Sequence, residues 1–219
     1  MPYYASLAGV RVTAARILIP PWGAAAGDAD LDTDAPLPAG VLPLVIGNLT
    51  LAMSVFRGGP FAGSRSVRLV AGAGGWGRDV GARFYRDAGG VKLSAIARDA
   101  AGEVGETVLV PADRLVGEFF AREFAPASRV LTQLVGLRGW HIDAAGVTRL
   151  AERSASRITT DFSAKLNPAA GHVEVATEDL ASWVPGAVFA SATIPTARTV
   201  SSVTIAMYED GRLRLEVLT

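Results

Sequence analysis

The hydrophobic pattern changes twice along this 219-residue chain. Up to about residue 85, short apolar runs alternate with polar positions and are separated by glycine and proline, which predicts antiparallel strands. Strands are predicted at residues 10–19, 41–46, 49–57 and 66–70. Gly47 and Asn48 form a two-residue hairpin signal, and residues 57–63 are predicted to be a loop. This region therefore predicts a small barrel or sandwich.

Residues 91–150 carry the helical signals and organise the chain. A first helix is predicted to end at Gly105, where positive φ is tolerated, and its apolar positions follow helical spacing: Leu93, Ile96, Ala97, Ala100 and Val104. A second helix is predicted over residues 126–135, with Ser128 as N-cap and Leu134 on the buried side. Residues 140–143 and 147–150 then flank a turn ending in Gly146, which predicts a hairpin with Trp140 in the small core. Between the helices, residues 108–110 predict a short strand.

The strand pattern returns after about residue 156. Residues 157–163 and 172–177 alternate, residues 187–190 form a short apolar run, and residues 199–208 and 213–218 predict a hairpin around residues 209–212. We therefore predict an α+β, mostly β protein, with two small barrel-like antiparallel β modules joined by a helix–strand–helix–hairpin module. The predicted domains are residues 1–88, 89–155 and 156–219. The pattern leaves open whether the two β modules are separate or form one composite barrel.

Composition narrows the function classes. Basic and acidic residues balance at 21 each, so no long-range charge favours nucleic acid or an anionic membrane. The absence of cysteine excludes disulfides and thiol chemistry. We expect no signal peptide and no membrane span. The positive mean hydropathy, +0.31, fits either an assembly subunit covered by partners or an alanine-rich chain.

Residues 72–77 match the spacing G-x-G-x-x-G after a predicted strand. A dinucleotide site needs a helix to begin within this loop, so that its N–H groups face the pyrophosphate. The following residues look extended, so we interpret Gly72–Gly77 as a glycine-rich turn carrying Trp76.

Asp28, Asp30, Asp32 and Asp34 alternate at the start of a calcium-loop spacing. The places that require glycine and glutamate hold Thr33 and Ala39, so the pattern fails. An extended conformation would place the four carboxylates on one side, where they would repel one another and remain solvated, so we interpret the segment as a solvated loop or strand edge rather than a metal site.

The remaining candidates predict no chemistry. His141 and His172 lie in strand-like runs and are expected to be half-buried structural residues. The basic residues Arg149, Arg153 and Arg157 are interpreted as ordinary solvated side chains. We therefore predict no catalytic, cofactor-binding or metal-binding residue, and no cofactor.

The middle segment is similar to a known family. Its helix ending in residues 102–106, the second helix with Val130, Leu131 and Leu134, and the hairpin with Trp140, Asp143 and Gly146 resemble the tail hub proteins of bacteriophages, including the baseplate hub and late-control D families of contractile tails. Residues 57–63 and 70–76 are also similar to Mu-like phage tail proteins.

The resemblance implies barrel-like β domains joined by an α/β module, in a virion structural protein without catalysis. Such hubs form a ring, commonly a homotrimer, that joins the tail tube to the central spike and baseplate around the DNA path. The DNA passes during ejection without specific binding, and no membrane binding is implied. The resemblance places the protein in the virion tail, assembled in the host cytoplasm. The alternatives are another tail adaptor, a carbohydrate-binding β module, or a nucleotide-binding enzyme based on Gly72–Gly77.

Overall fold

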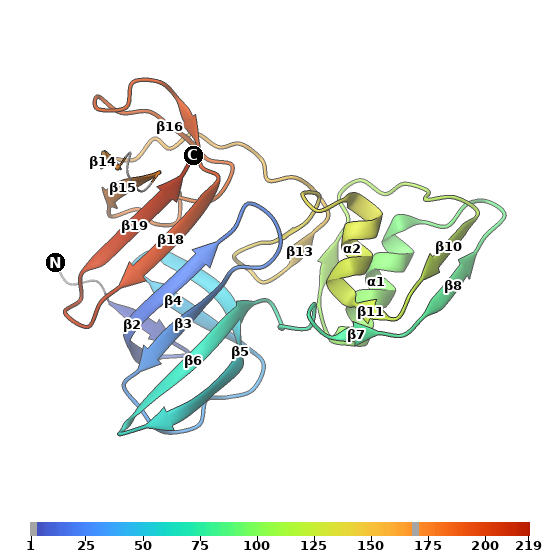
Figure 1. The fold of residues 1–219 in the computed structure, drawn as a ribbon, viewed down its shortest axis with the longest axis horizontal. Coiled ribbons are helices and arrows are strands. Elements are labelled where there is room, and N and C mark those ends of the chain that lie inside the picture. Colours follow the sequence, from blue (N-terminus) through green and yellow to red (C-terminus); the bar gives the residue numbers. More distant parts are fainter. Residues whose placement is uncertain (1–3, 168–170) are drawn as a thin grey trace.

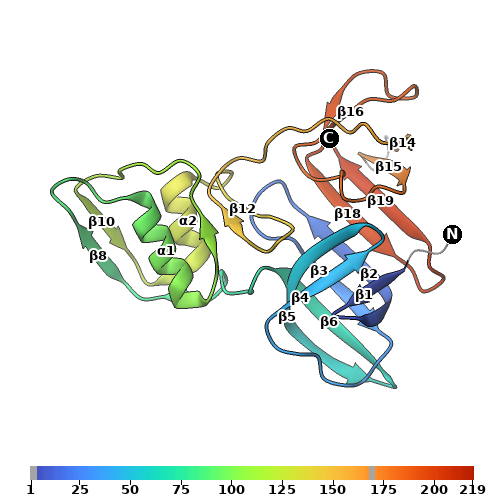
Figure 2. The same ribbon diagram turned by 180° about the vertical axis from the view of Figure 1, so that it is seen from behind.

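The computed structural model describes residues 4–167 and 171–219. They form two lobes (Figure 1). The β lobe holds the strands of residues 5–71 and 162–218, and the helical lobe holds residues 79–135. A short hairpin lies between the lobes in both views (Figures 1 and 2). Residues 1–3, which belong to the N-terminal run expected to lack a signal peptide, lie outside the described part.

Six antiparallel strands of the β lobe close into a barrel. They are β1 (Ala5–Leu7), β2 (Val10–Ile19), β3 (Ala26–Leu31), β4 (Val41–Ile46), β5 (Leu49–Phe61) and β6 (Ser64–Ala71), in the order β1-β4-β5-β6-β3-β2, and β2 pairs back onto β1. Alternating side chains fill the barrel: in β4, Leu42, Leu44 and Ile46 are buried. The predicted strands at 10–19 and 41–46 are confirmed with those bounds, as is the turn at Gly47 and Asn48.

The predicted loop at residues 57–63 is wrong. Strand β5 continues to Phe61 and pairs with β6 as far as Ser64. The chain reverses at Ala62 and Gly63, whose φ angles are 49° and 83°. Two consecutive positive φ angles make the tight turn that matches strand twist. The glycines before it lie within an extended strand and did not mark a turn.

The C-terminal part supplies six strands: β14 (Phe162–Asn167), β15 (His172–Thr177), β16 (Val188–Phe189), β17 (Arg198–Thr199), β18 (Ser202–Met207) and β19 (Leu213–Leu218). Four of them, β14, β15, β18 and β19, extend the same sheet, whereas β16 and β17 pair with each other in a separate sheet. Strand β18 pairs with Ala15–Ile19 of β2, and β19, β15 and β14 follow outward. Both β modules therefore share one ten-stranded sheet through β2. The strand predicted at 157–163 begins only at Phe162, because Arg157 makes an isolated bridge to Val188 instead.

The turn residue Asn48 also fastens the two β parts together. Its amide nitrogen donates to Asp179 at 2.8 Å, and its amide oxygen accepts from the N–H groups of Leu180 and Ala181 at 2.9 and 3.2 Å. Just after these residues in the chain, the fully buried Trp183 packs against Phe189 and Phe162, whose ring centroids lie 5.1 and 5.0 Å from its own. A residue that the sequence marks only as a turn thus links the barrel to the C-terminal strands.

The middle segment supplies the two helices. Helix α1 (Leu93–Val104) and helix α2 (Ala127–Val135) confirm both predictions. Around them lie β7 (Asp79–Val80), β8 (Arg83–Arg86), β9 (Val108–Leu109), β10 (Phe119–Arg122), β11 (Ala125–Pro126), β12 (His141–Ile142) and β13 (Thr148–Arg149). Strand β8 pairs with β10, β7 with β11, and β13 with both β12 and β9. The predicted hairpin at 140–150 is the β12–β13 pair.

The C-terminus of α1 is capped within its own segment, whereas the N-terminus of α2 is satisfied by distant residues. Gly105 ends α1 at φ 74°, as predicted. Ser128 is not the N-cap of α2: Pro126 holds that position, and the N–H groups of Ala127 and Ser128 donate to the carbonyls of Arg78 and Trp76. A tertiary contact replaces the side-chain cap because those first N–H groups need an acceptor from any source.

The fold class is confirmed as α+β and mostly β. The division at residues 88 and 155 stays a prediction; strands β7 and β8, which precede residue 88, pair with strands of the helical lobe. Neither helix of the described residues is long and apolar enough to span a bilayer.

Leu134 is 3% exposed and provides a test of the predicted helix face. Leu134→Ala should lower the free energy of unfolding by about 2–5 kcal/mol, because it leaves a cavity between α2 and α1. The measurement is urea denaturation. The matched change Leu137→Ala, at a side chain 57% exposed, should be close to neutral. Equal effects at both positions would mean that the buried face of α2 has been misassigned.

Candidate functional site

The glycine loop at residues 72–77 already holds an anion from its own chain. It leads from β6 towards β7, and no helix of the described residues begins in it. The N–H groups of Gly75 and Ala73 donate to the Glu106 carboxylate at 2.6 and 3.2 Å. The groups that a pyrophosphate would need are therefore occupied. The loop supports the interpretation as a glycine-rich turn with a packed Trp76, and gives no support to nucleotide binding.

Glycine is required in this loop by close approach. A Cβ on Gly75 would lie 2.2 Å from the carbonyl oxygen of Val104, at the end of α1. The loop thus presses directly on the helix terminus, where Gly105 turns the chain and Glu106 points back. Burial raises the pKa of the Glu106 carboxyl above its usual range, and the hydrogen bonds from Gly75 and Ala73 partly offset this effect.

The same loop joins the lobes through two tryptophans. The buried Trp76 donates its indole N–H to the hydroxyl of Thr148 at 2.7 Å, and its ring lies 6.1 Å from that of Trp140. Gly23 of the β lobe donates to the Trp140 carbonyl at 2.9 Å and accepts from Ile142 at 3.0 Å. These contacts hold the β12–β13 hairpin against the barrel. In this joint the Glu106 carboxylate, the Trp76 indole and the Thr148 hydroxyl have partners within the chain, whereas the buried Trp140 indole N–H has none among the described residues.

The acidic residues Asp28, Asp30, Asp32 and Asp34 are exposed, as the sequence indicates. Only the first two lie within β3, where both face outward. The structure adds partners that the sequence did not predict. Asp28 pairs with Arg68 at 2.6 Å, Asp30 accepts from Ser66 at 2.5 Å, and Asp32 lies 3.8 Å from Arg11. Neighbouring strands therefore compensate much of this charge.

The histidines have structural positions. His141 is buried, its Nδ1 lies 3.0 Å from the Ala151 carbonyl, and burial lowers its pKa. His172 is half-buried on β15, 3.6 Å from Glu174. The interpretation of Arg153 as a solvated side chain is wrong. It is half-buried, and its guanidinium donates to the carbonyls of Pro20 and Pro21 at 3.5 and 3.3 Å, because the segment after the hairpin packs against the end of β2.

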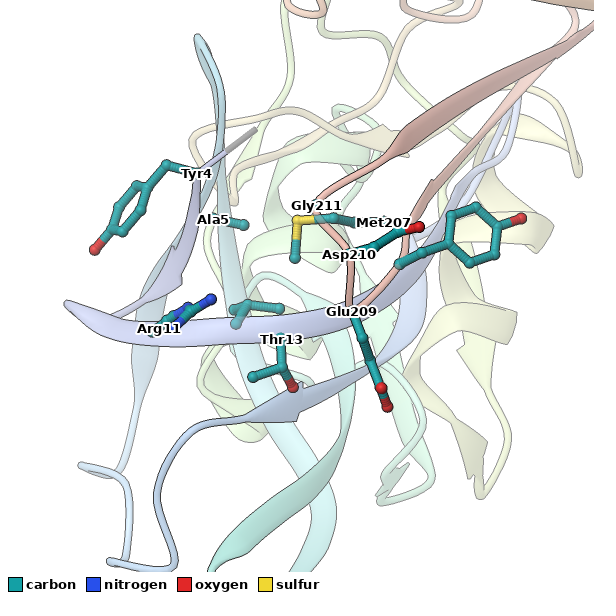
Figure 3. A pocket seen from close by; sticks show the side chains of 10 residues that line it. Tyr4, Ala5, Arg11, Thr13, Met207, Glu209, Asp210 and Gly211 are labelled. Atoms are coloured by element: carbon teal, nitrogen blue, oxygen red, sulfur yellow. The ribbon is translucent and has the colours of Figure 1, made fainter. Parts of the chain in front are cut away.

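Across residues 4–167 and 171–219, no group of three metal-ligating side chains gathers. One surface hollow, about 480 Å³, lies where β1 and β2 meet the turn after β18. Figure 3 shows Tyr4 and Arg11 on one side and Glu209 on the other. It is open to solvent and brings together no nucleophile with a base, so its arrangement indicates no reaction.

Several large apolar side chains are exposed in separate places. Phe84 and Phe119 stack on the outer face of β8 and β10, with ring centroids 6.1 Å apart. Phe56 and Phe61 are exposed on β5 of the barrel. Such surfaces mark contacts with other proteins more often than chemistry. The sequence does not mark these residues, because a phenylalanine in a strand gives the same pattern whether its side chain is buried or exposed.

Comparison with known proteins identifies the fold. No protein-family model and no curated protein matches the sequence. Among solved structures, the chain is similar to the 43 kDa tail protein of prophage MuSo2 from Shewanella oneidensis, with a TM-score of 0.62 and 11% identity over 99% of this chain and 97% of that one. It is also similar to the tail protein from Neisseria meningitidis MC58, with a TM-score of 0.66 and 13% identity over 99% and 96% of the two chains.

A third similar structure comes from a secretion machine. It is an Escherichia coli protein described as a component of the type VI secretion system with structural similarity to the T4 bacteriophage tail proteins gp27 and gp5. The TM-score is 0.63 at 11% identity, over 97% of this chain and 75% of that one. The chain therefore has the fold of phage tail proteins, which confirms the resemblance of its middle segment at the level of the fold.

Glu106 generates a pH prediction. Because its folded-state pKa is raised, its contribution to stability is complete below about pH 4.3, where an unfolded glutamate titrates, and is lost as the pH rises through the folded-state pKa. The difference in Tm between the native chain and Glu106→Gln should therefore shrink as pH rises from about 4 to 7. Thermal unfolding monitored by circular dichroism measures it.

The control for this series is Glu152→Gln, which removes a carboxylate from an exposed side chain. It reports any general effect of losing one negative charge. A difference between the native chain and Glu106→Gln that stays constant, or that widens towards neutral pH, would contradict the prediction.

Proposed function

We propose that this protein is a structural hub of a phage tail or a related injection machine, without catalysis. In this proposal the chain forms a ring, a homotrimer, that joins the tail tube to the central spike and baseplate around the DNA path. The three parts at residues 1–88, 89–155 and 156–219 act as its modules. The protein is assembled in the host cytoplasm and is carried in the virion tail.

The single observation that carries the proposal is the fold over the whole chain. Nearly all of the chain superposes on nearly all of two phage tail proteins, and on most of a type VI secretion component. The likeness includes the barrel, the helical lobe and the C-terminal strands together. A shared combination of all three parts favours a shared role more strongly than a shared barrel alone, since single small barrels serve many functions.

The geometry suits a structural subunit that holds its neighbours in fixed positions. The closed barrel leaves no free edge to recruit strands at random. Strand β2 fixes the C-terminal strands to it, and the joint around Glu106 and Trp76 fixes the helical lobe. A closed ring needs two different surfaces on each subunit. The exposed Phe56 and Phe61 on β5 of the barrel offer one such surface.

The acidic strand fits a lumen that DNA must leave easily. Asp28 and Asp30 are exposed on β3 in a chain of zero net charge. Negative charge on a channel wall repels phosphate and reduces sticking. Their pairing with Arg68 and Ser66 keeps this effect modest and local.

The mass in solution and the position in the particle test the proposal. Light scattering should give about three times the chain mass of 22.7 kDa, alone or when mixed with the tube and spike proteins. Cryo-electron microscopy of the tail should place this density between the tube and the spike. Density at a fibre tip or the outer baseplate would contradict the hub. Binding on a glycan array would favour the carbohydrate-binding module, and a rise in Tm with NAD would favour the enzyme.

A further inference from the structure

We propose that the outer edge of β8 is a docking site for an extended, acidic segment of another protein, which adds as a third strand to the β8–β10 ribbon. The site lies at the end of the helical lobe that is remote from the barrel (Figure 1). This docking site does not depend on the proposed ring, because a single chain supplies all of its residues.

The backbone of β8 has an open side. In the described residues, β8 pairs only with β10, from Arg83 opposite Arg122 to Arg86 opposite Phe119. The next pair, Asp87 and Glu118, is hydrogen-bonded, with Asp87 N–H donating to the Glu118 carbonyl at 3.1 Å. Hydrogen-bonded and non-bonded pairs alternate in antiparallel strands. Phe84 and Arg86 therefore turn their N–H and C=O groups away from β10, towards the open edge.

A groove of about 400 Å³ runs beside this edge. Its wall on one side is β8, and on the other it is the start of α1 with Lys92 and Ala95. Three cationic side chains line it, from Arg83, Arg86 and Lys92, against one anion, Asp87. Arg83 already binds Asp99, and Arg86 lies over the Phe119 ring, 5.7 Å from its centroid. With Arg83 paired, Arg86 and Lys92 still outnumber Asp87 in the groove lining, so the groove is basic on balance, and its lining includes all four residues of β8.

The outward face of the β8–β10 ribbon carries two exposed aromatic rings beside the charged groove. Phe84 is 63% exposed and Phe119 is 54% exposed, although the two rings stack on each other. An added strand would lie beside Phe84, and its alternate side chains would shield that ring from water. Backbone pairing would supply affinity, and the side-chain pattern would supply selectivity.

The ribbon is held in its binding shape by its inner face. The Arg122 side chain is 1% exposed and binds Asp99 at 3.2 Å and Glu103 at 2.5 Å on α1. Tyr85 donates its hydroxyl to the same Asp99 carboxylate. This network fixes β8 and β10 to α1 before any partner arrives, so little ordering is needed on binding.

Charge complementarity identifies the occupant as a different protein. Two copies meeting edge to edge along β8 would oppose Arg83 and Arg86 with the same residues, and like charges across a strand pair are unfavourable. The outermost strand of the ten-stranded sheet, β14, carries Lys165 and no acid. The acidic strand β3 is paired on both edges, with β2 and β6. Among these three strands of the described chain, a second copy therefore offers no strand that is both acidic and free to pair.

Synthetic peptides test the proposal on the full chain. The probe is a fluorescent peptide of four Glu-Val repeats, and the matched control peptide has Lys in place of Glu. Anisotropy should show that the Glu peptide binds at least about tenfold more tightly. Hydrogen exchange by NMR should show new protection at the Phe84 and Arg86 amides when it is bound.

Charge reversal and aromatic removal complete the test. Arg86→Glu should invert the peptide preference, and Phe84→Ser should weaken binding of the Glu peptide about tenfold. The matched controls are Arg57→Glu and Phe61→Ser, both on exposed β5 positions of the barrel, and neither should change binding. Equal binding of the two peptides, absence of protection at Phe84 and Arg86, or equal losses in the β5 controls would each overturn the proposal.

Discussion

Strand β2 joins both β parts of this protein, because different residues along one of its edges pair with the barrel and with the C-terminal strands. The rest of the architecture depends on this shared edge. Its first residues pair with β1 and close the barrel, and residues Ala15–Ile19 pair with β18. A single continuous strand cannot bend sharply without losing ladder hydrogen bonds, so the barrel and the C-terminal strands hold one relative orientation. Asn48 adds a second link between the two β parts, through the Asp179 carboxylate and the N–H groups of Leu180 and Ala181. The question left open by the sequence, separate modules or a composite, is resolved by this shared edge.

The helical lobe is attached by polar groups that are buried together. Glu106 receives the N–H groups of the glycine loop, Trp76 binds Thr148, and the carbonyls of Trp76 and Arg78 receive the first N–H groups of α2. Each group would be costly if buried alone, and each is a partner of another. The residues that most resembled a ligand site thus form a joint. The glycine loop therefore fixes the position of the helical lobe, although its sequence spacing resembled a nucleotide-binding motif.

The sequence predicted those elements whose signals are local. The alternation at residues 10–19 and 41–46, the helical spacing ending at Gly105, and the hairpin at 140–150 depend on neighbouring residues, and the structure has them. The wrong predictions also came from local signals, but in these places contacts with distant residues determine the structure. Glycines 58 and 59 indicated a loop but lie in β5, where pairing with β6 keeps them extended. Ser128 was predicted to cap α2, but Trp76 and Arg78 supply the acceptors.

What the sequence determined by itself was the two helices, the longer barrel strands and the hairpin at 140–150. Through the middle segment it also determined a resemblance to phage tail proteins, which the fold bears out. Only the tertiary structure decided that β18 pairs with β2, that Glu106 fills the glycine loop, and that Phe84 and Phe119 face outward. The physical reason is that propensity and periodicity act over a few residues. Edge pairing, burial of charge and exposure of an aromatic ring depend on which distant segment arrives at the same place.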